Sequence, residues 1–276
     1  MTYEDIRYDR DETGIVTITI NRPEKLNAFR AETVDELIDA FQTAWRDRGC
    51  GVVILTGEGD RAFCVGGDQS ARGEGGGYGT GSDTGGARHD VGIDVEDLHT
   101  LIRDIPKPVI AAVNGYAIGG GHVLHVLCDL TIAADTARFG QTGPRVGSFD
   151  AGYGTSYLAR VVGEKRAREI WFLCRQYDAE TAERWGLVNR VVPAAELRAE
   201  VRRWADEILA LSPTALRFLK QSFNSETEHL AAQGALAFSG LHEFARSPEA
   251  QEGVRAFAEK RPPDFAPFRA HASRPL

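Results

Sequence analysis

Two glycine-rich turns are the segments of this sequence best suited to do chemistry. The first is Cys64-Val-Gly-Gly-Asp68, and the second is Gly115-Tyr-Ala-Ile-Gly-Gly-Gly-His122; each follows a short apolar run. Glycine lets the backbone approach a ligand closely and adopt a positive φ. Two backbone N–H groups that point at one oxygen atom form an oxyanion hole. A lone glycine turn is usually only a turn, but two of them in one domain predict a site that stabilises an oxyanion.

The composition is that of a globular protein whose partner is not a charged polymer. The 276 residues are 42% hydrophobic and 26% charged, and their net charge is −8. This length allows one large α/β domain, or a core with a small helical extension. The acidic balance argues against generic binding of nucleic acid or of an anionic membrane surface. It leaves room for a local basic patch that holds a phosphate group.

The cysteines and the N-terminus predict a cytoplasmic protein without a metal site. No cysteine has CxxC spacing, and no histidine cluster has the spacing of zinc ligands. We expect free thiols in a reducing cytosol; they are Cys50, Cys64, Cys128 and Cys174. The N-terminus is charged from its start, and neither a signal-peptide region nor an apolar run of membrane-spanning length is present.

Alternating strand and helix patterns predict an α/β core followed by helices. Between the first two strands, apolar residues at helical spacing predict an amphipathic helix over residues 31–47, and another helix begins near Gly121. The expected strands are short apolar or alternating runs at residues 16–20, 51–56, 108–113 and 129–134. The expected C-terminal helices cover residues 164–175, 179–185, 194–211, 213–223, 227–245 and a segment near 248–260.

Residues 73–92 differ from the rest of the chain, because they are rich in glycine and almost free of aliphatic side chains. Such a segment buries too little apolar surface to become ordered unaided. It is either a flexible surface loop or a lid that becomes ordered over a substrate. Its start, just after the first glycine turn, favours the lid.

The two turns, together with Asn21-Arg-Pro-Glu-Lys-Leu-Asn27, resemble the crotonase (enoyl-CoA hydratase/isomerase) superfamily over residues 3–268. This resemblance implies an acyl-CoA thioester substrate whose enolate is stabilised by the backbone N–H groups of Gly67 and Gly120. It also implies a spiral of ββα units over residues 1–205, followed by a helical trimerisation region over residues 206–276. The implied assembly is a homotrimer or a homohexamer built as a dimer of trimers.

The residues that hydratases use to handle water are missing. In the superfamily, one glutamate follows the glycine triplet by two positions, and a second lies in a Phe-Gly-Gln-x-Glu turn. These two positions are Val123 and Gly143 in this sequence. Because neither residue transfers a proton, simple hydration of an enoyl-CoA is not expected.

Three longer stretches resemble the 1,4-dihydroxy-2-naphthoyl-CoA synthases, which act in menaquinone biosynthesis. They are residues 119–125, 140–150 and 168–176. In that family, glycine at the position of Gly143 marks enzymes that use a bound bicarbonate as the catalytic base. The resemblance assigns the bicarbonate cradle to Gln141, Thr142 and Trp171, beside Gly143.

The same resemblance assigns Ser148 and Asp150 to a catalytic pair, in which the carboxylate polarises a hydroxyl and passes protons to the second carbonyl of the substrate. From spacing alone, the two residues fit a simple turn after Gly147 equally well. Tyr78 matches a lid tyrosine that reaches the substrate, and Arg72 matches a basic residue near the same loop.

Cations are needed for the phosphates of coenzyme A, and the candidates are Lys25, Arg30 and Lys260, the last with its neighbour Arg261 and from an adjacent subunit. Each is otherwise a solvated surface charge. His122 and His125 are three positions apart in a predicted helix. We interpret them as packed or hydrogen-bonded helix residues and not as metal ligands.

Two positions depart from the synthase pattern and leave a second activity open. The synthases carry a lysine at the position of Ser70 and a tyrosine at that of Ala245. Residues 67–70, 94–104 and 212–216 also resemble 2-ketocyclohexanecarboxyl-CoA hydrolase, which opens a ring by cleaving a carbon–carbon bond. The sequence thus predicts ring closure of o-succinylbenzoyl-CoA, with ring opening as the alternative and a non-catalytic, RNA-binding crotonase fold as a weaker one. It determines neither the exact acyl group nor whether the assembly is a trimer or a hexamer.

Overall fold

The larger of two β-sheets is built from the predicted apolar strands and two flanking ones. The computed structural model describes residues 3–70 and 95–273. The spatial order of this sheet is β1-β2-β3-β5-β7-β10; β1 runs antiparallel to β2 and all other neighbours are parallel. The strands are β1 (Ile6–Arg10), β2 (Ile15–Ile20), β3 (Val52–Gly57), β5 (Val109–Val113), β7 (Leu130–Ala134) and β10 (Arg190–Val192).

The smaller sheet consists of four three-residue strands in the order β4-β6-β8-β9. They are β4 (Ala62–Cys64), β6 (Tyr116–Ile118), β8 (Arg138–Gly140) and β9 (Gln176–Asp178). The first three are parallel, and β9 is antiparallel to β8. Because the carboxyl ends of parallel neighbours meet at one edge of a sheet, the segments that follow β4, β6 and β8 lie together.

The chain winds as a spiral in which each turn gives one strand to each sheet and then a helix. The first such turn is β3, β4 and α2 (Val95–Asp104), and the second is β5, β6 and α3 (Gly120–Leu127). The third is β7 and β8, followed by short 3₁₀ turns and α4 (Ser156–Val162). This arrangement is the expected spiral of ββα units, and it confirms the predicted α/β fold class.

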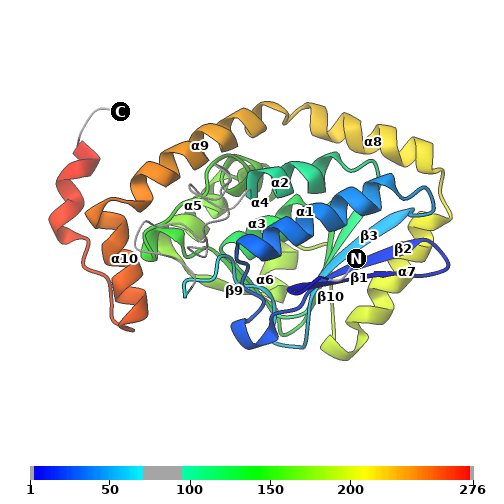
Figure 1. The fold of residues 1–276 in the computed structure, drawn as a ribbon, viewed down its shortest axis with the longest axis horizontal. Helices are drawn as coiled ribbons and strands as arrows, with labels where there is room; N and C mark the ends of the chain where they lie inside the picture. Colours follow the sequence, from blue (N-terminus) through cyan, green and yellow to red (C-terminus); the bar gives the residue numbers. More distant parts are fainter. Residues whose placement is uncertain (1–2, 71–94, 274–276) are drawn as a thin grey trace.

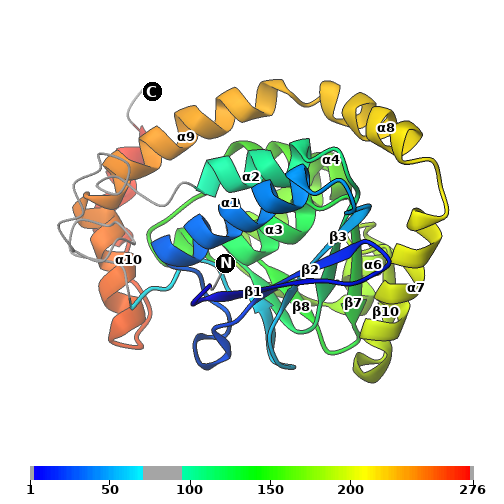
Figure 2. The same cartoon turned by 45° about the vertical axis from the view of Figure 1, so that its right-hand side comes forward.

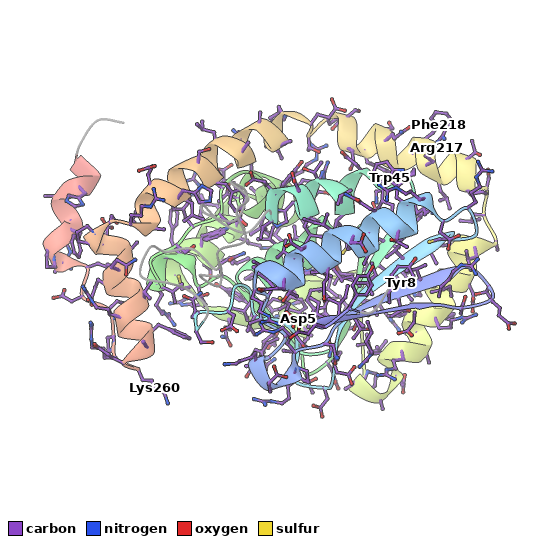
Figure 3. All side chains as sticks on the ribbon, in the orientation of Figure 1. Asp5, Tyr8, Trp45, Arg217, Phe218 and Lys260 are labelled. Atoms are coloured by element: carbon purple, nitrogen blue, oxygen red, sulfur yellow. The ribbon has the colours of Figure 1, made fainter. Side chains whose placement is uncertain are left out.

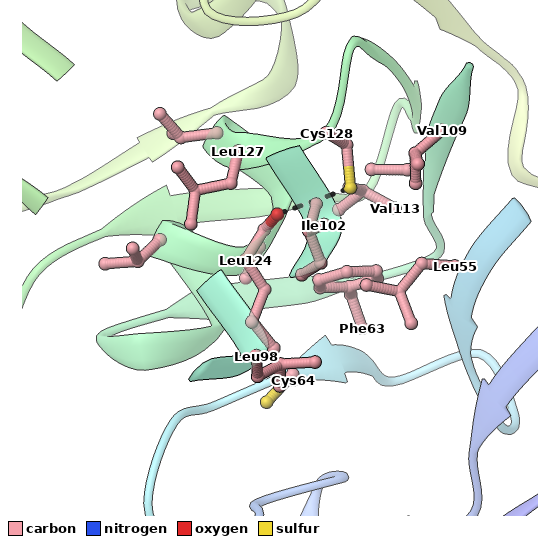
Figure 4. Packing of buried hydrophobic residues seen from close by; sticks show 14 of the residues in the cluster. Leu55, Phe63, Cys64, Leu98, Ile102, Val109, Val113, Leu124, Leu127 and Cys128 are labelled. Carbon is pink, nitrogen blue, oxygen red and sulfur yellow. Dashed lines mark hydrogen bonds between the residues drawn. The ribbon is translucent and has the colours of Figure 1, made fainter. Parts of the chain in front are cut away.

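Both faces of the larger sheet are covered by apolar side chains of helices. On one face, α1 (Ala31–Arg46), α2 and α3 enclose the main core, whose fully buried side chains include Phe63, Leu98 and Leu124. Figure 4 shows this packing and the bond from Cys128 Sγ to the Leu124 carbonyl. On the other face, α7 (Leu197–Leu209) packs a smaller apolar cluster against the strands.

The last helices leave the sheet and arch over the molecule. In both ribbon views, α8 (Pro213–Ser225) and α9 (His229–Ala245) curve around the core, and α10 (Pro248–Ala258) lies at the far end (Figures 1 and 2). Buried cations anchor the arch: Lys220 Nζ lies 2.7 Å from Asp129 Oδ2, and Arg103 donates to Thr227 Oγ1 at 2.6 Å. The remaining helices are α5 (Glu164–Leu173) and α6 (Ala179–Arg184).

The predicted strands and helices are present, with ends shifted by a few residues at most. The three-residue strands and the seven-residue helix α4 were not predicted, because elements this short carry too few residues to show a period. Strand β1 and the ten-residue helix α2 were not predicted either. The boundary expected between residues 205 and 206 falls inside α7, and the helices that leave the sheet begin with α8. The predicted lid, residues 73–92, lies outside the described residues. Across residues 3–70 and 95–273, no helix is both long enough and apolar enough to span a bilayer.

Candidate active site

The first glycine turn is held by one backbone bridge that leaves an N–H group unused. Phe29 pairs with Gly67 in an isolated parallel bridge. Phe29 N donates to Gly66 O at 2.9 Å, and Asp68 N donates to Phe29 O at 2.8 Å. Gly66 has φ +82°, a conformation that favours glycine. In the described part of the chain, Gly67 N has no hydrogen-bond acceptor, so this N–H is available to a ligand.

The second glycine turn ends at the start of α3. Gly119 has φ +58°, and its N–H donates to Gly140 O on β8 at 3.0 Å. Gly120 is the first residue of the helix, where backbone N–H groups have no acceptor within the helix. The partial positive charge of the helix N-terminus adds to the attraction for an anion.

The two turns touch each other. A Cβ atom on Gly66 would lie 2.8 Å from Gly120 N, and one on Gly120 would lie 2.6 Å from Phe29 Cζ and 3.4 Å from Gly66 Cα. Any side chain at these positions would push the turns apart. The contact therefore keeps the free N–H groups of Gly67 and Gly120 in adjacent turns, as the predicted oxyanion hole requires.

Buried charged side chains hold the first glycine turn in place. The carboxylate of Asp68 accepts hydrogen bonds from Ser70 Oγ at 2.6 Å and from Arg22 at 3.0 Å. Burial alone would raise the pKa of Asp68, but these bonds lower it below its ordinary value. Arg22 also lies 3.6 Å from Asp5, which Arg30 contacts at 2.8 Å. Asp68 therefore stays ionised and holds its turn in place.

Several residues predicted to bind coenzyme A lie apart or have other partners. The Arg30 guanidinium is bonded to Asp5 and Glu4, so it stabilises the fold near the first turn instead of being free to bind a phosphate. Lys25 Nζ lies 3.2 Å from Ser70 Oγ, next to the first turn. Lys260 is exposed and points outward from the end of α10 (Figure 3). Arg72 and Tyr78 lie outside the described residues.

The positions of the hydratase glutamates have surroundings that suit their present residues. Val123 is 1% exposed and belongs to the main core. A Cβ atom on Gly143 would lie 2.8 Å from Ser148 O and 3.0 Å from Trp171 Cζ3. A glutamate therefore needs a different backbone at residue 143, and the described site has no carboxylate at either position.

Gln141 and Thr142 lie beside the second glycine turn, whereas Trp171 is engaged elsewhere. Gln141 is 1% exposed, and its Nε2 donates to Gly119 O at 3.3 Å. Thr142 Oγ1 is 3.6 Å from where a Cβ of Gly119 would be, and it makes no hydrogen bond within the described residues. The indole N–H of Trp171 donates to Gly154 O at 2.6 Å. Gln141 and Thr142 thus remain candidate ligands for a small anion, and Trp171 serves to hold the turn at Gly154.

Asp150 is a half-buried acid whose carboxyl group is enclosed and lacks a charged partner. Its Oδ1 atom is inaccessible and has no hydrogen-bond partner in the described part of the chain. Burial raises the pKa of Asp150 from its ordinary value of 3.8 to about 7, and the backbone N–H of Gly154 offsets part of this rise. Ser148 lies two residues earlier, and its N–H donates to Gly143 O at 2.9 Å. An acid with a pKa near neutrality is suited to give or take a proton during turnover.

The histidine pair is part of the core, as the sequence indicated. His125 Nε2 lies 3.2 Å from His122 Nδ1, and both rings pack against Phe139. Burial lowers the pKa of His122 to about 3, and that of His125 also lies well below its ordinary value. The two rings are therefore neutral, and they support α3 behind the second glycine turn.

Comparisons with a family model and with solved structures agree on the family of this chain. The model of the enoyl-CoA hydratase/isomerase family matches residues 10–267. The chain belongs to this family. Its membership confirms the resemblance to the crotonase superfamily that the glycine turns predicted.

Solved structures of the family share the whole fold. An enoyl-CoA hydratase from Mycobacterium avium subsp. paratuberculosis K-10 is 27% identical, with a TM-score of 0.83 over 96% of this chain and 99% of that one. An enoyl-CoA hydratase from Bacillus anthracis is 32% identical, with a TM-score of 0.72 over 95% and 98% of the two chains. An enoyl-CoA hydratase/isomerase from Pseudoalteromonas atlantica T6c is 27% identical, with a TM-score of 0.81 over 95% and 100%.

Because the two glycine turns touch, one added methyl group should lower turnover strongly. Gly66→Ala places a Cβ against Gly120 N and should separate the two N–H donors. Loss of one oxyanion donor lowers turnover by roughly 10²- to 10³-fold. Turnover of the acyl-CoA substrate, measured at a saturating concentration, checks this expectation.

Gly59→Ala is the matched control for Gly66→Ala. Gly59 has nearly the same φ, +81°, but its Cβ would meet nothing closer than Pro23 Cβ at 4.0 Å. Gly59→Ala introduces similar backbone strain outside the contact between Gly66 and Gly120 and should retain turnover. Equal losses in the two variants would mean that strain, and not the contact, is responsible.

Asp150→Asn should abolish turnover and change how stability depends on pH. The pKa of Asp150 is higher in the folded chain than its ordinary value, so its contribution to stability is fully present below pH 3.8 and is lost as the pH rises to about 7. This rise in pKa corresponds to on the order of 4 kcal/mol. Chemical denaturation of the wild type and the variant at pH 4 and pH 8 measures the difference.

The variant lacks this ionisation, so it should be the more stable protein at pH 8 and should lose that advantage near pH 4. Activity of the wild type should fall as the pH rises through about 7, if protonated Asp150 is the proton donor. A variant with wild-type turnover, or with the same pH dependence of stability as the wild type, would remove Asp150 from the site.

Proposed function

We propose that this chain is a 1,4-dihydroxy-2-naphthoyl-CoA synthase, a lyase that closes the second ring of o-succinylbenzoyl-CoA. One observation carries the proposal: free N–H groups lie in two adjacent turns, the two hydratase positions carry no carboxylate, and the segment after Gly143 holds the enclosed carboxyl group of Asp150. Such a site suits formation and use of a thioester enolate better than activation of water for addition to a double bond.

The residues have separate roles in the proposed reaction. The N–H groups of Gly67 and Gly120 bind the thioester oxygen and stabilise the charge that develops when the α-proton is lost. The enolate carbon then attacks the carbon of the aryl carboxyl group. Asp150, assisted by Ser148, donates a proton to the oxygen that leaves as water. Each of the two ring carbons between the carbonyl groups of the new ring then loses one proton and each carbonyl oxygen gains one, which makes the new ring aromatic.

The base that removes the α-proton is not a side chain of the described site. The hydroxyl of Thr142 and the amide of Gln141 fit a bicarbonate ion, since both are uncharged donors next to the second glycine turn. Bicarbonate bound there would supply the basic oxygen that a glutamate supplies in hydratases. Trp171 is left out of this cradle, because its only N–H is bonded to Gly154 O.

A ring-opening hydrolase of the 2-ketocyclohexanecarboxyl-CoA type is the second candidate. Ser70 favours this candidate, because the synthases carry a lysine at the same position. In this structure the Ser70 hydroxyl is bonded to Lys25 and Asp68. Both reactions pass through a thioester enolate beside a second carbonyl carbon, so the same residues serve either direction. The enclosed carboxyl group of Asp150 and the free N–H groups argue against a non-catalytic, RNA-binding role.

The outer side of the C-terminal helices supports the proposal of a homotrimer or a dimer of trimers. Large apolar side chains are exposed there: Phe218 is 58%, Phe223 78%, Leu236 76% and Phe257 56% accessible. Figure 3 shows Phe218 on the outer side of α8. Apolar groups exposed over several helices are typical of surfaces that bind another protein chain.

Incubation with o-succinylbenzoyl-CoA tests the function directly. We expect formation of dihydroxynaphthoyl-CoA, followed by absorbance, and a rate that falls after bicarbonate is removed by degassing. Thr142→Val removes a donor to the anion and should raise the bicarbonate concentration needed for half-maximal rate by about tenfold. Hydrolysis of 2-ketocyclohexanecarboxyl-CoA without ring closure would establish the second candidate instead.

Phe223→Glu tests the assembly. A charge at this exposed apolar position should weaken a buried interface between copies of the chain. Sedimentation velocity should give a trimer or hexamer for the wild type and smaller species for the variant. Arg184→Glu, at an exposed ion pair on α6, is the control and should sediment like the wild type. A monomeric wild type would contradict the proposed assembly.

A further inference from the structure

Helix α10 lies directly against the turn that precedes the catalytic pair. A Cβ atom on Gly147, which has φ +67°, would lie 2.7 Å from Ala250 Cα. In the other direction, a Cβ atom on Gly253 would lie 2.5 Å from the carbonyl carbon of Val146 and 2.8 Å from Gly147 Cα. Ala250 is fully buried in this contact. The helix and the turn therefore approach as closely as two backbones without side chains allow.

Helix α9 holds the same segment a few residues further on. A Cβ atom on Gly152, which has φ +80°, would lie 2.8 Å from Gly234 N. The rings of Phe149 and Phe244 pack with their centres 5.7 Å apart. The backbone around Asp150 is thus fixed from outside by residues of two C-terminal helices.

These contacts matter because few hydrogen bonds hold the carboxyl group of Asp150 itself. Its Oδ1 atom has no partner within residues 3–70 and 95–273, and only the N–H of Gly154 interacts with the carboxyl group. The neighbours that α9 and α10 contribute to the segment are apolar residues or glycines, namely Leu230, Gly234, Phe244, Ala250 and Gly253. The position of the backbone therefore decides how far the carboxyl group is from water.

A group of hydrogen bonds around Glu252, called the clasp below, ties helix α10 to the chain that follows it. Glu252 accepts hydrogen bonds from Arg261 at 2.6 and 3.0 Å and from the backbone N–H of Asp264 at 2.8 Å. At the other end, Ser247 Oγ caps the helix by accepting from Ala250 N at 3.1 Å. Glu252 is the chain neighbour of Gly253, so loss of the clasp frees the C-terminal end of α10 and is expected to loosen the contact with Gly147.

We propose that Gly253 of α10 is a positioning residue, which sets the place of Ser148 and Asp150 through its backbone contact with Gly147. The inference rests on the proposed function for its role in turnover. Helix α10 then influences turnover by fixing the backbone that carries Ser148 and Asp150, in addition to any role in assembly. The effect depends on the absence of a side chain at residue 253.

Gly253→Ala and Gly234→Ala form a matched pair of variants. Both place a methyl group on a C-terminal helix and raise helix propensity equally. A Cβ on Gly234 would meet no atom within 4 Å, whereas one on Gly253 meets the turn. We expect Gly253→Ala to lower kcat on the order of 10²-fold, with a smaller change in KM, and Gly234→Ala to behave like the wild type.

Titration of Asp150 separates this inference from the proposed function, because it needs no substrate. Carbon-13 NMR of aspartate-labelled protein, with Asp150→Asn to assign the signal, follows the carboxyl group in each variant. A displaced turn should admit water, so that in Gly253→Ala the group titrates about one pH unit lower. A wild-type titration curve in Gly253→Ala, or the same shift in Gly234→Ala, would overturn the positioning role even if ring closure is observed.

Arg261→Gln provides the same test if Gly253→Ala does not fold. It breaks the clasp on Glu252 at the surface and should shift the Asp150 titration in the same direction. Arg184→Gln, which breaks an exposed ion pair on α6, is its control. An unchanged titration in Arg261→Gln with a loosened α10, detected by faster amide exchange of that helix, would contradict the proposal.

Discussion

The rest of the site depends on the contact between two glycine turns that follow adjacent parallel strands. Gly66 and Gly120 approach so closely that neither position has room for a Cβ atom. This approach is possible because β4 and β6 pair in parallel and end at the same edge of the small sheet. The bridge from Phe29 then uses the donors and acceptors around Gly67 but leaves its N–H free. A fold that winds strands into a spiral thus produces two donors for one oxygen atom.

Two aspartates, one in the first glycine turn and one shortly after Gly147, show how the surroundings of a carboxyl group determine its role. Asp68 is surrounded by donors and remains ionised, so it serves as a fixed support. The carboxyl group of Asp150 is enclosed without a charged neighbour, so its pKa moves to about 7. One carboxyl group stabilises structure and the other is free to exchange a proton. Their roles follow from the hydrogen bonds that each receives, since the side chains are chemically identical.

The chain shares its fold with enoyl-CoA hydratases, and the proposed function differs from hydration through a few positions on that fold. The chain aligns with those structures over nearly its whole length. Val123 is a core residue and Gly143 is enclosed by Ser148 and Trp171, so the surroundings of both positions suit residues without a carboxylate. In the proposed function, the oxyanion hole is formed by the backbone of the shared fold, whereas proton transfer depends on the side chains around it.

The sequence by itself determined the family, the α/β core and the glycine turns, because these depend on local patterns: strand-length apolar runs, helical spacing and glycines at tight turns. Single strands of three residues were invisible, since their pairing is set by neighbours far along the chain. The tertiary structure alone decided the partners of individual side chains. It tied Arg30 to Asp5 and Trp171 to Gly154, and it isolated Asp150 from other charges. It also brought Gly253 against Gly147; an isolated glycine inside a helix hinted at close packing, but only the folded chain identifies what it packs against.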